Sequence, residues 1–190
     1  FVNGGKKVNP VLINRIQNRR GKTIFNSDAN DCEGCKIVSN EEDKVFTPKV
    51  IDNYKQVLSK ETAYQITSML EGVIKRGTGK KLRSLNVPLA GKTGTTNDNF
   101  DAWFIGSTSD LTIGVYIGFD NPKSLGKYET GSKAALPVFK KFVENSIYKE
   151  EMKNFKAPET INFFSIDYDK GEFMGFIEKK SITEAFKEKN

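Results

Sequence analysis

The sequence predicts an α+β fold, an antiparallel β-sheet flanked by helices. Two stretches, near 61–76 and 135–147, carry apolar residues at helical spacing. Between them, three strand-like stretches lie at about 87–96, 101–108 and 111–119. The links that join these strands are too short for a crossover, so the strands must pair antiparallel and the helices must cover the sheet.

The composition suits one globular domain. The chain has 190 residues, of which 37% are hydrophobic and 28% are charged. The formal charge of +6 comes from lysines and arginines spread along the chain, so we expect a solvated surface and no nucleic-acid partner. The chain begins at Phe1 and has no leader and no apolar run near 18 residues. We therefore expect a piece of a longer protein.

Histidine is absent from the chain, which restricts the possible chemistry. Ser-His-Asp and Cys-His mechanisms are excluded within these residues, and Lys, Tyr or carboxylates remain for proton transfer. Cys32 and Cys35 provide only two of the four ligands that a structural zinc site needs. We therefore predict no metal and no cofactor. In an oxidising compartment the two cysteines can join in a local disulfide. The alternative is that both remain free thiols.

The N-terminal part is expected to form a hairpin and a loop. Val11–Gln17 and Lys22–Phe25 flank a turn in which Gly21 can supply a left-handed residue. The next residues are rich in Asp, Asn, Glu, Ser and Lys, so we predict a loop insertion at 26–50.

The first helix is expected to begin after Ser59, a plausible N-cap, and to end at Gly77-Thr78-Gly79. We expect its apolar stripe to lie in the core. The stripe consists of Ala63, Ile66, Met69, Leu70, Val73 and Ile74.

The strand at 111–119 alternates between large apolar residues and small or polar ones. We expect the helix near 135–147 to pack on the small-residue face, with Pro137 tolerated only near the first turn of that helix. The small-residue face carries Thr112, Gly114, Tyr116 and Gly118. At the C-terminus we expect a hairpin of 161–166 with 173–177, and then a frayed helix at 181–190.

Gly91 to Thr96 (GKTGTT) combines a lysine, two glycines and three hydroxyls on one strand. Strand alternation directs Lys92 and Gly94 to one side and Thr93 and Thr95 to the other. Gly94 leaves a gap in which the backbone of a ligand can approach closely. Next in the chain, Trp103 is expected to lie in the core rather than to stack on substrate. Asp101 either pairs with Lys92 or caps the turn.

The motifs around Gly91 to Thr96 resemble the C-terminal part of the transpeptidase domain of bifunctional (class A) penicillin-binding proteins. The resemblance covers about 1–148, with a gap near 26–50, and leaves 149–190 as a C-terminal extension. It rests on FVNGG at 1–5, Ile13 to Gly21, TAYQITSML at 62–70, GTG at 77–79, LAGKTGTT at 89–96, DAWFIG at 101–106 and GVYIGFD at 114–120.

The resemblance implies a partial penicillin-binding or β-lactamase-like fold and a serine D,D-transpeptidase that cross-links peptidoglycan and is acylated by β-lactams. It implies a catalytic role for Lys92, which would assist proton relay and attract the terminal carboxylate of a D-alanyl-D-alanine stem peptide. Thr93, Gly94 and Thr95 would bind that substrate, and the Thr95 N–H would be one of two oxyanion-hole donors. The resemblance also implies a glycosyltransferase in the same polypeptide and a location on the outer face of the bacterial inner membrane. Attachment to that membrane would be only through an N-terminal anchor outside this chain.

The nucleophilic serine of this family, in a Ser-x-x-Lys element, is expected to lie outside this chain. Ser124-to-Lys127, Ser146-to-Lys149 and Ser84-to-Asn86 match the catalytic elements formally. We reject them because in the family both other elements precede Lys-Thr-Gly, and the Ser-x-x-Lys element does so by a long way, at the start of a buried helix. The chain thus carries half a site and is expected to be inactive alone.

Two alternatives remain at this stage: a non-catalytic binding or interaction module with the same sheet, and a D-alanyl-D-alanine carboxypeptidase or β-lactamase relative. We also expect the isolated chain to self-associate, because the apolar strand at 111–119 would lack a partner on its far side.

Overall fold

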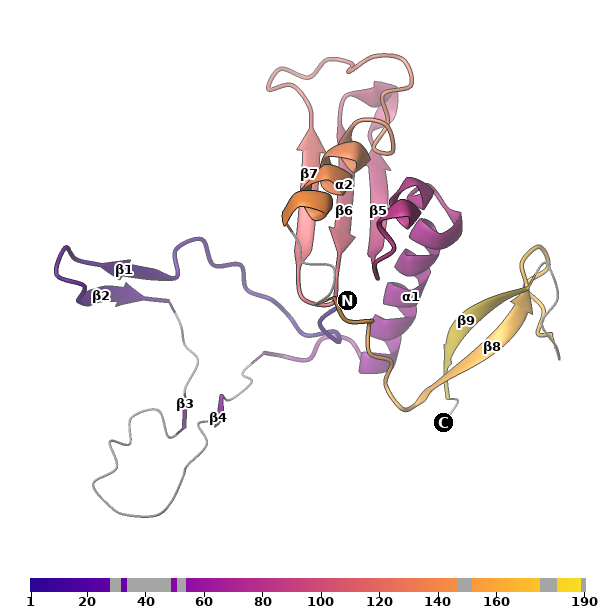
Figure 1. Ribbon diagram of the computed structural model, residues 1–190, viewed down its shortest axis with the longest axis horizontal. Coiled ribbons are helices and arrows are strands. Elements are labelled where there is room, and N and C mark those ends of the chain that lie inside the picture. Colours follow the sequence, from indigo (N-terminus) through magenta and orange to yellow (C-terminus); the bar gives the residue numbers. More distant parts are fainter. Residues whose placement is uncertain (28–31, 34–48, 51–53, 147–151, 175–180, 189–190) are drawn as a thin grey trace. The chain divides into compact units, whose positions relative to one another are not determined.

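The computed structural model describes residues 1–27, 32–33, 49–50, 54–146, 152–174 and 181–188, with 32–33 and 49–50 described by their backbone alone (Figure 1). The contacts within the chain define two units. One is Lys6–Val57, and the other combines Phe1–Gly5 with Leu58–Asn190.

The smaller unit contains the hairpin that the sequence predicts. Strand β1 (Arg15–Gln17) pairs antiparallel with β2 (Thr23–Asn26). In the turn, Gly21 adopts a φ of +78°, and the Asn18 side chain accepts hydrogen bonds from the N–H groups of two following residues, Arg20 and Lys22. This confirms the predicted left-handed glycine.

The predicted insertion at 26–50 contains one described strand pair. Strand β3 (Cys32–Glu33) pairs antiparallel with β4 (Lys49–Val50). Cys35 lies outside the described residues. The disulfide between Cys32 and Cys35 and its alternative, two free thiols, therefore both stay untested predictions.

Helix α1 (Lys60–Arg76) begins and ends where the sequence predicts. The Ser59 hydroxyl accepts a hydrogen bond from the Thr62 N–H at 3.2 Å, and the Gly77 N–H donates to the Val73 carbonyl at 3.0 Å. Ala63 is fully buried, whereas Met69 is 61% exposed. An α-helix turns by about 100° per residue, so Met69 lies about 240° around the helix from the buried Ala63. The prediction that Met69 lies in the core was therefore wrong.

The central sheet has the strand order β5-β6-β7 and is antiparallel throughout, as predicted. Its strands are β5 (Ala90–Thr95), β6 (Ala102–Ser107) and β7 (Thr112–Ile117). A 3₁₀ helix, η1 (Lys80–Leu85), precedes β5, and a short one, η2 (Asn97–Asn99), follows it. Strand β5 is therefore one edge of this sheet.

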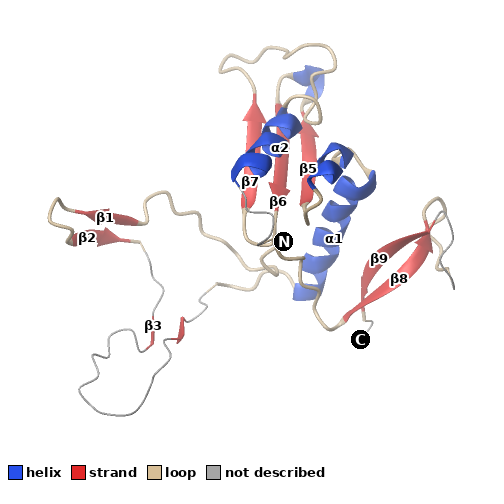
Figure 2. Ribbon diagram, viewed as in Figure 1, coloured by secondary structure: helices blue, strands red, loops and turns tan. Residues whose placement is uncertain are grey.

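Helix α2 (Ala135–Ser146) covers one face of the sheet (Figure 2). Pro137 lies in its first turn, as required. However, α2 packs on the apolar face of β7 and not on its small-residue face, so that prediction was wrong. The apolar face removes more surface from water, and the close approach is provided by Gly106 of β6, where a Cβ would lie 2.5 Å from the Phe139 ring.

One hydrophobic core joins α1, η1, the sheet and α2. The rings of Phe104 and Phe139 are fully buried and meet edge to face, with centroids 4.8 Å apart. The other buried members are Ile74, Leu82, Leu85, Leu89, Ala135, Leu136 and Val143.

The C-terminal segment forms a hairpin of β8 (Ile161–Asp167) and β9 (Ser181–Lys187). The predicted helix at 181–190 was wrong. Ala185 is 7% exposed, and its carbonyl accepts a hydrogen bond from the Gln65 side chain of α1, so contacts with α1 and β8 select the strand. Of the predicted partner 173–177, Phe173 bridges to Ile166, and 175–180 lie outside the described residues.

Within the described residues, no helix combines the length and apolarity that crossing a membrane requires.

Candidate functional site

The Lys-Thr-Gly residues occupy the edge strand β5, and the strand register assigns them to two faces. Thr93 pairs with Phe104 and Thr95 pairs with Ala102, so both threonines lie on the face that α2 covers. Lys92 and Gly94 lie on the opposite, outer face, as strand alternation predicts. A Cβ on Gly94 would lie 3.1 Å from the Trp103 Cβ, so glycine keeps this point of the outer face open.

The free edge of β5 presents backbone groups and a positive charge together. The Thr96 N–H donates to the Asp101 carbonyl at 3.1 Å, which directs it toward β6. Successive N–H groups of a strand point to opposite edges, so the Thr95 N–H points away from β6. The Lys92 Nζ donates to the Thr93 carbonyl at 2.8 Å. The ammonium group therefore lies beside the backbone of the same short segment.

Both threonine hydroxyls have partners that sequence reasoning did not assign. The hydroxyls of Thr93 and Thr78 lie 3.0 Å apart, and the Thr95 hydroxyl accepts a hydrogen bond from the Gly131 N–H at 3.0 Å. The sequence suggested for Thr78 only a place at the end of the first helix, and η1 separates it from β5. Nothing in the sequence connects Gly131 with Thr95, which precedes it by 36 residues.

Trp103 lies on the outer face and not in the core, so its predicted burial was wrong. Its indole is 40% exposed and packs on the Tyr116 ring at a centroid distance of 4.7 Å. The Tyr116 hydroxyl donates to the Asp101 carboxylate at 2.9 Å. This hydrogen bond raises the pKa of Tyr116, because it holds the phenol proton. Asp101 thus takes Tyr116 as its partner, instead of either role that the sequence suggested for its side chain.

The three serines that match the catalytic elements only formally do not lie at the start of a helix, where the family's nucleophile is expected. The Ser124 hydroxyl donates to the Asp98 carbonyl at 2.8 Å, in a loop. The Lys127 Nζ lies over the Tyr128 ring, 5.3 Å from its centroid. Ser84 donates to the Lys81 carbonyl within η1, and Ser146 is the last residue of α2.

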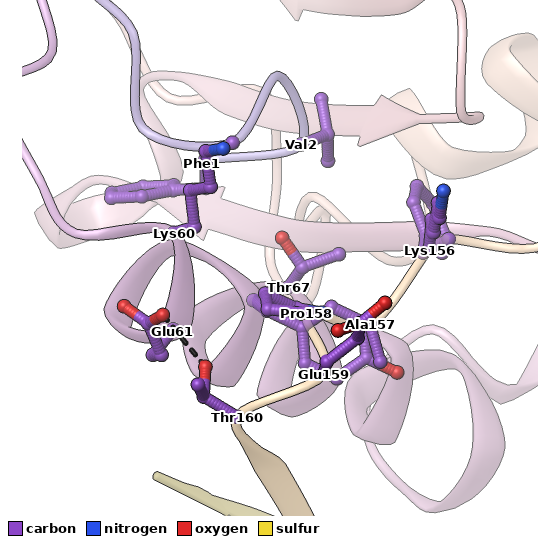
Figure 3. Close-up of a pocket in the computed structure, with 13 residues that line it drawn as sticks. Phe1, Val2, Lys60, Glu61, Thr67, Lys156, Ala157, Pro158, Glu159 and Thr160 are labelled. Atoms are coloured by element: carbon purple, nitrogen blue, oxygen red, sulfur yellow. Dashed lines mark hydrogen bonds between the residues drawn. The ribbon is translucent and has the colours of Figure 1, made fainter.

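A separate cavity of about 450 Å³ lies at the start of α1 (Figure 3). The Thr160 hydroxyl donates to the Glu61 carboxylate at 2.7 Å, and this bond lowers the pKa of Glu61. Phe1, Tyr64 and Pro158 contribute apolar surface to its lining. None of the Lys-Thr-Gly residues lines this cavity, so it is distinct from the edge of β5.

Comparison with known proteins decides the family. The family model described as the penicillin binding protein transpeptidase domain matches residues 1–144. The chain belongs to this family. The resemblance that the motifs indicated is thereby confirmed, and with it the α+β transpeptidase fold.

The curated relatives are all longer than the matched region. Penicillin-binding protein 1A of Rickettsia prowazekii is 40% identical over 190 residues, which is 100% of this chain and 24% of that protein. Penicillin-binding protein 1A of Pseudomonas aeruginosa is 35% identical over 88% of this chain and 24% of its own length. The chain thus spans about a quarter of these relatives.

A solved structure supports the fold. The crystal structure of penicillin-binding protein 1A from Haemophilus influenzae matches 97% of this chain and 30% of that chain, with a TM-score of 0.69 and 24% sequence identity. The roles of Lys92, Thr93, Gly94 and Thr95 remain proposals and are developed next.

Proposed function

We propose that this chain supplies the Lys-Thr-Gly wall of a serine D,D-transpeptidase site. One observation carries the proposal. At the free edge of β5, the Lys92 ammonium lies 2.8 Å from the Thr93 carbonyl, and the Thr95 N–H points to the same edge. A positive charge at a strand edge that no other described strand pairs with fits an extended ligand that ends in a carboxylate.

Each residue of the wall has a distinct role in this proposal. Lys92 places positive charge beside the reacting hydroxyls, which assists proton transfer and attracts the terminal carboxylate of a D-alanyl-D-alanine stem peptide. The hydroxyls of Thr93 and Thr95 bind that carboxylate or the carboxylate of a β-lactam. The Thr95 N–H donates to the oxyanion that forms during acyl transfer. Gly94 leaves space for the ligand backbone.

The nucleophilic serine and the second oxyanion donor come from elsewhere in the polypeptide, which we propose is a class A penicillin-binding protein. In such a protein, a glycosyltransferase is part of the same chain, and the site works on peptidoglycan at the outer face of the inner membrane. The names of the relatives and the matched family support this assignment. These 190 residues alone would then form no covalent acyl-enzyme.

The test is the acylation rate of the full-length polypeptide with a fluorescent penicillin. Lys92→Ala should lower this rate by about 100-fold or more, the range of a lost proton-transfer group. The melting temperature should stay nearly unchanged, because the Lys92 side chain is exposed. Lys187→Ala is the matched control, an exposed lysine on strand β9. Equal rates for Lys92→Ala and Lys187→Ala would remove Lys92 from the mechanism.

A further inference from the structure

The hydrogen bond between Gly131 and Thr95 gives the Thr95 hydroxyl a direction. We propose that Gly131 is a positioning residue, which holds this hydroxyl so that its proton is presented to the substrate carboxylate. This inference rests on the proposed function of the Lys-Thr-Gly strand and adds a residue that lies on a different element.

The direction follows from what each group can do. A backbone N–H can only donate, so at 3.0 Å the Thr95 oxygen must be the acceptor. A hydroxyl has one proton and two lone pairs, and the Gly131 contact uses one lone pair. The Thr95 proton is therefore left to point elsewhere, and the exposed position of Thr95 allows it to meet a ligand. A carboxylate, which only accepts, is the complementary partner.

The Thr93 hydroxyl has different neighbours: it accepts a long hydrogen bond from the Lys92 Nζ at 3.5 Å, and a second hydroxyl lies close to it. It lies 3.0 Å from the Thr78 hydroxyl, and either oxygen can donate. The Thr93 proton can thus be used within the protein, whereas the Thr95 proton cannot be used in its contact with Gly131. The two hydroxyls are therefore not equivalent toward an anion.

Gly131 is held rigidly by the start of α2. Its carbonyl accepts a hydrogen bond from the Leu136 N–H at 2.8 Å, and the Thr130 carbonyl accepts one from the Ala134 N–H at 2.8 Å. Leu136 and the neighbouring Ala135 are fully buried in the core. The position of the Gly131 N–H is therefore fixed by the packed helix and not by the exposed loop before it.

Only glycine fits at position 131, and the reason is space. A Cβ there would lie 2.6 Å from the Gly94 carbonyl oxygen and would also collide with the Trp103 carbonyl oxygen. Both obstacles are backbone atoms of β5 and β6, which cannot rotate away. Gly131→Ala must therefore push the 131 backbone away from β5 and break its bond with Thr95.

The decisive experiment compares two ligands of the full-length polypeptide. One is a peptide that ends in D-alanyl-D-alanine with a free carboxylate, and the other is the same peptide with a C-terminal amide. Gly131→Ala should lower kcat/KM for the carboxylate peptide by about 10-fold to 100-fold, the value of a hydrogen bond to a charged group. The amide peptide should change little. Gly114→Ala is the control, because a Cβ at Gly114 meets nothing within 4 Å.

A merely structural role for Gly131 predicts a different result. In that case both peptides lose activity equally, and the losses caused by Gly131→Ala and Thr95→Val add in the double variant. Our proposal predicts little further loss when Gly131→Ala is added to Thr95→Val. Equal loss for both peptides, or additive losses, would overturn it.

A measurement at the natural Gly131 covers the case in which Gly131→Ala does not fold. The Gly131 amide should exchange with solvent faster in Thr95→Val than in the wild type, and Thr95→Ser should retain the protection. Equal exchange in all three proteins would also overturn the proposal. These results can be told apart from a failure of the proposed function itself. That failure would appear as an unchanged acylation rate in Lys92→Ala.

Discussion

The two faces of the β5–β7 sheet differ sharply in what covers them. On the α2 face, Phe104 and Phe139 are fully buried in the common core. On the outer face, Ile105 is 50% exposed, Trp103 is 40% exposed and Tyr116 is 49% exposed. The same three strands thus carry a packed side and an open side.

This difference separates buried residues, whose loss should affect stability, from exposed ones, whose loss should affect the chemistry. Substitutions of the buried residues on the α2 face remove packed contacts and should lower the free energy of unfolding. The exposed Lys92 side chain starts on the outer face and donates to the Thr93 carbonyl and hydroxyl, so its loss should act on the reaction. The predictions below test this division, beginning with the largest expected effect.

Phe139→Ala should lower the free energy of unfolding by about 3–5 kcal/mol, because the ring is fully buried and its removal leaves a cavity beside Phe104. Phe142→Ala is the matched control on the same helix, since Phe142 is 44% exposed. Denaturant unfolding of the full-length polypeptide measures both. A similar effect of the two substitutions would contradict the description of α2 as packed through Phe139.

Gly106→Ala should destabilise the protein by about 1–3 kcal/mol through overpacking. The added Cβ would lie 2.5 Å from the Phe139 ring and 2.8 Å from the Phe104 ring. Gly114→Ala adds the same methyl group at an open point of β7 and should change stability far less. If Gly106→Ala were the milder of the two, the close contact between α2 and β6 would be wrong.

Asp101→Asn should lower the pKa of Tyr116 toward its ordinary value, with the smallest effect on the protein. The hydrogen bond to Asp101 raises the pKa of Tyr116, so its stabilising effect is present below the ordinary tyrosine pKa near 10.0 and is lost as pH rises through the raised pKa. NMR titration of labelled tyrosine can follow the shift. An unchanged Tyr116 pKa in Asp101→Asn would show that this hydrogen bond does not form in solution.

The sequence predicts an element of the fold well where the residues that determine it are neighbours in the chain. Helix α1 was predictable because both ends are local, with Ser59 capping the start and Gly77 closing the end. Strand β9 was not, because a helical pattern at 181–190 gives way to pairing with β8 and to burial of Ala185 against α1. Residues in contact across the chain override a weak local preference.

The residues proposed for the site divide in the same way. The placement of Lys92 to Thr95 on one strand could be predicted because they form one run in the sequence, and their alternation follows from strand geometry. The partners of the two hydroxyls, Thr78 and Gly131, could not, because the fold brings them from a helix end and from the start of α2. Gly131 has no reactive group of its own, so its role depends on the position of its N–H alone.

The decisive measurement is to map the residue that a β-lactam acylates in the full-length polypeptide. We expect one covalent label, on a serine outside these 190 residues, that forms much more slowly in Lys92→Ala and at the normal rate in Lys187→Ala. Digestion and mass spectrometry locate the label. A stoichiometric label on Ser124, on Ser146 or on any other residue of this chain would contradict the claim that it provides the Lys-Thr-Gly wall and not the nucleophile.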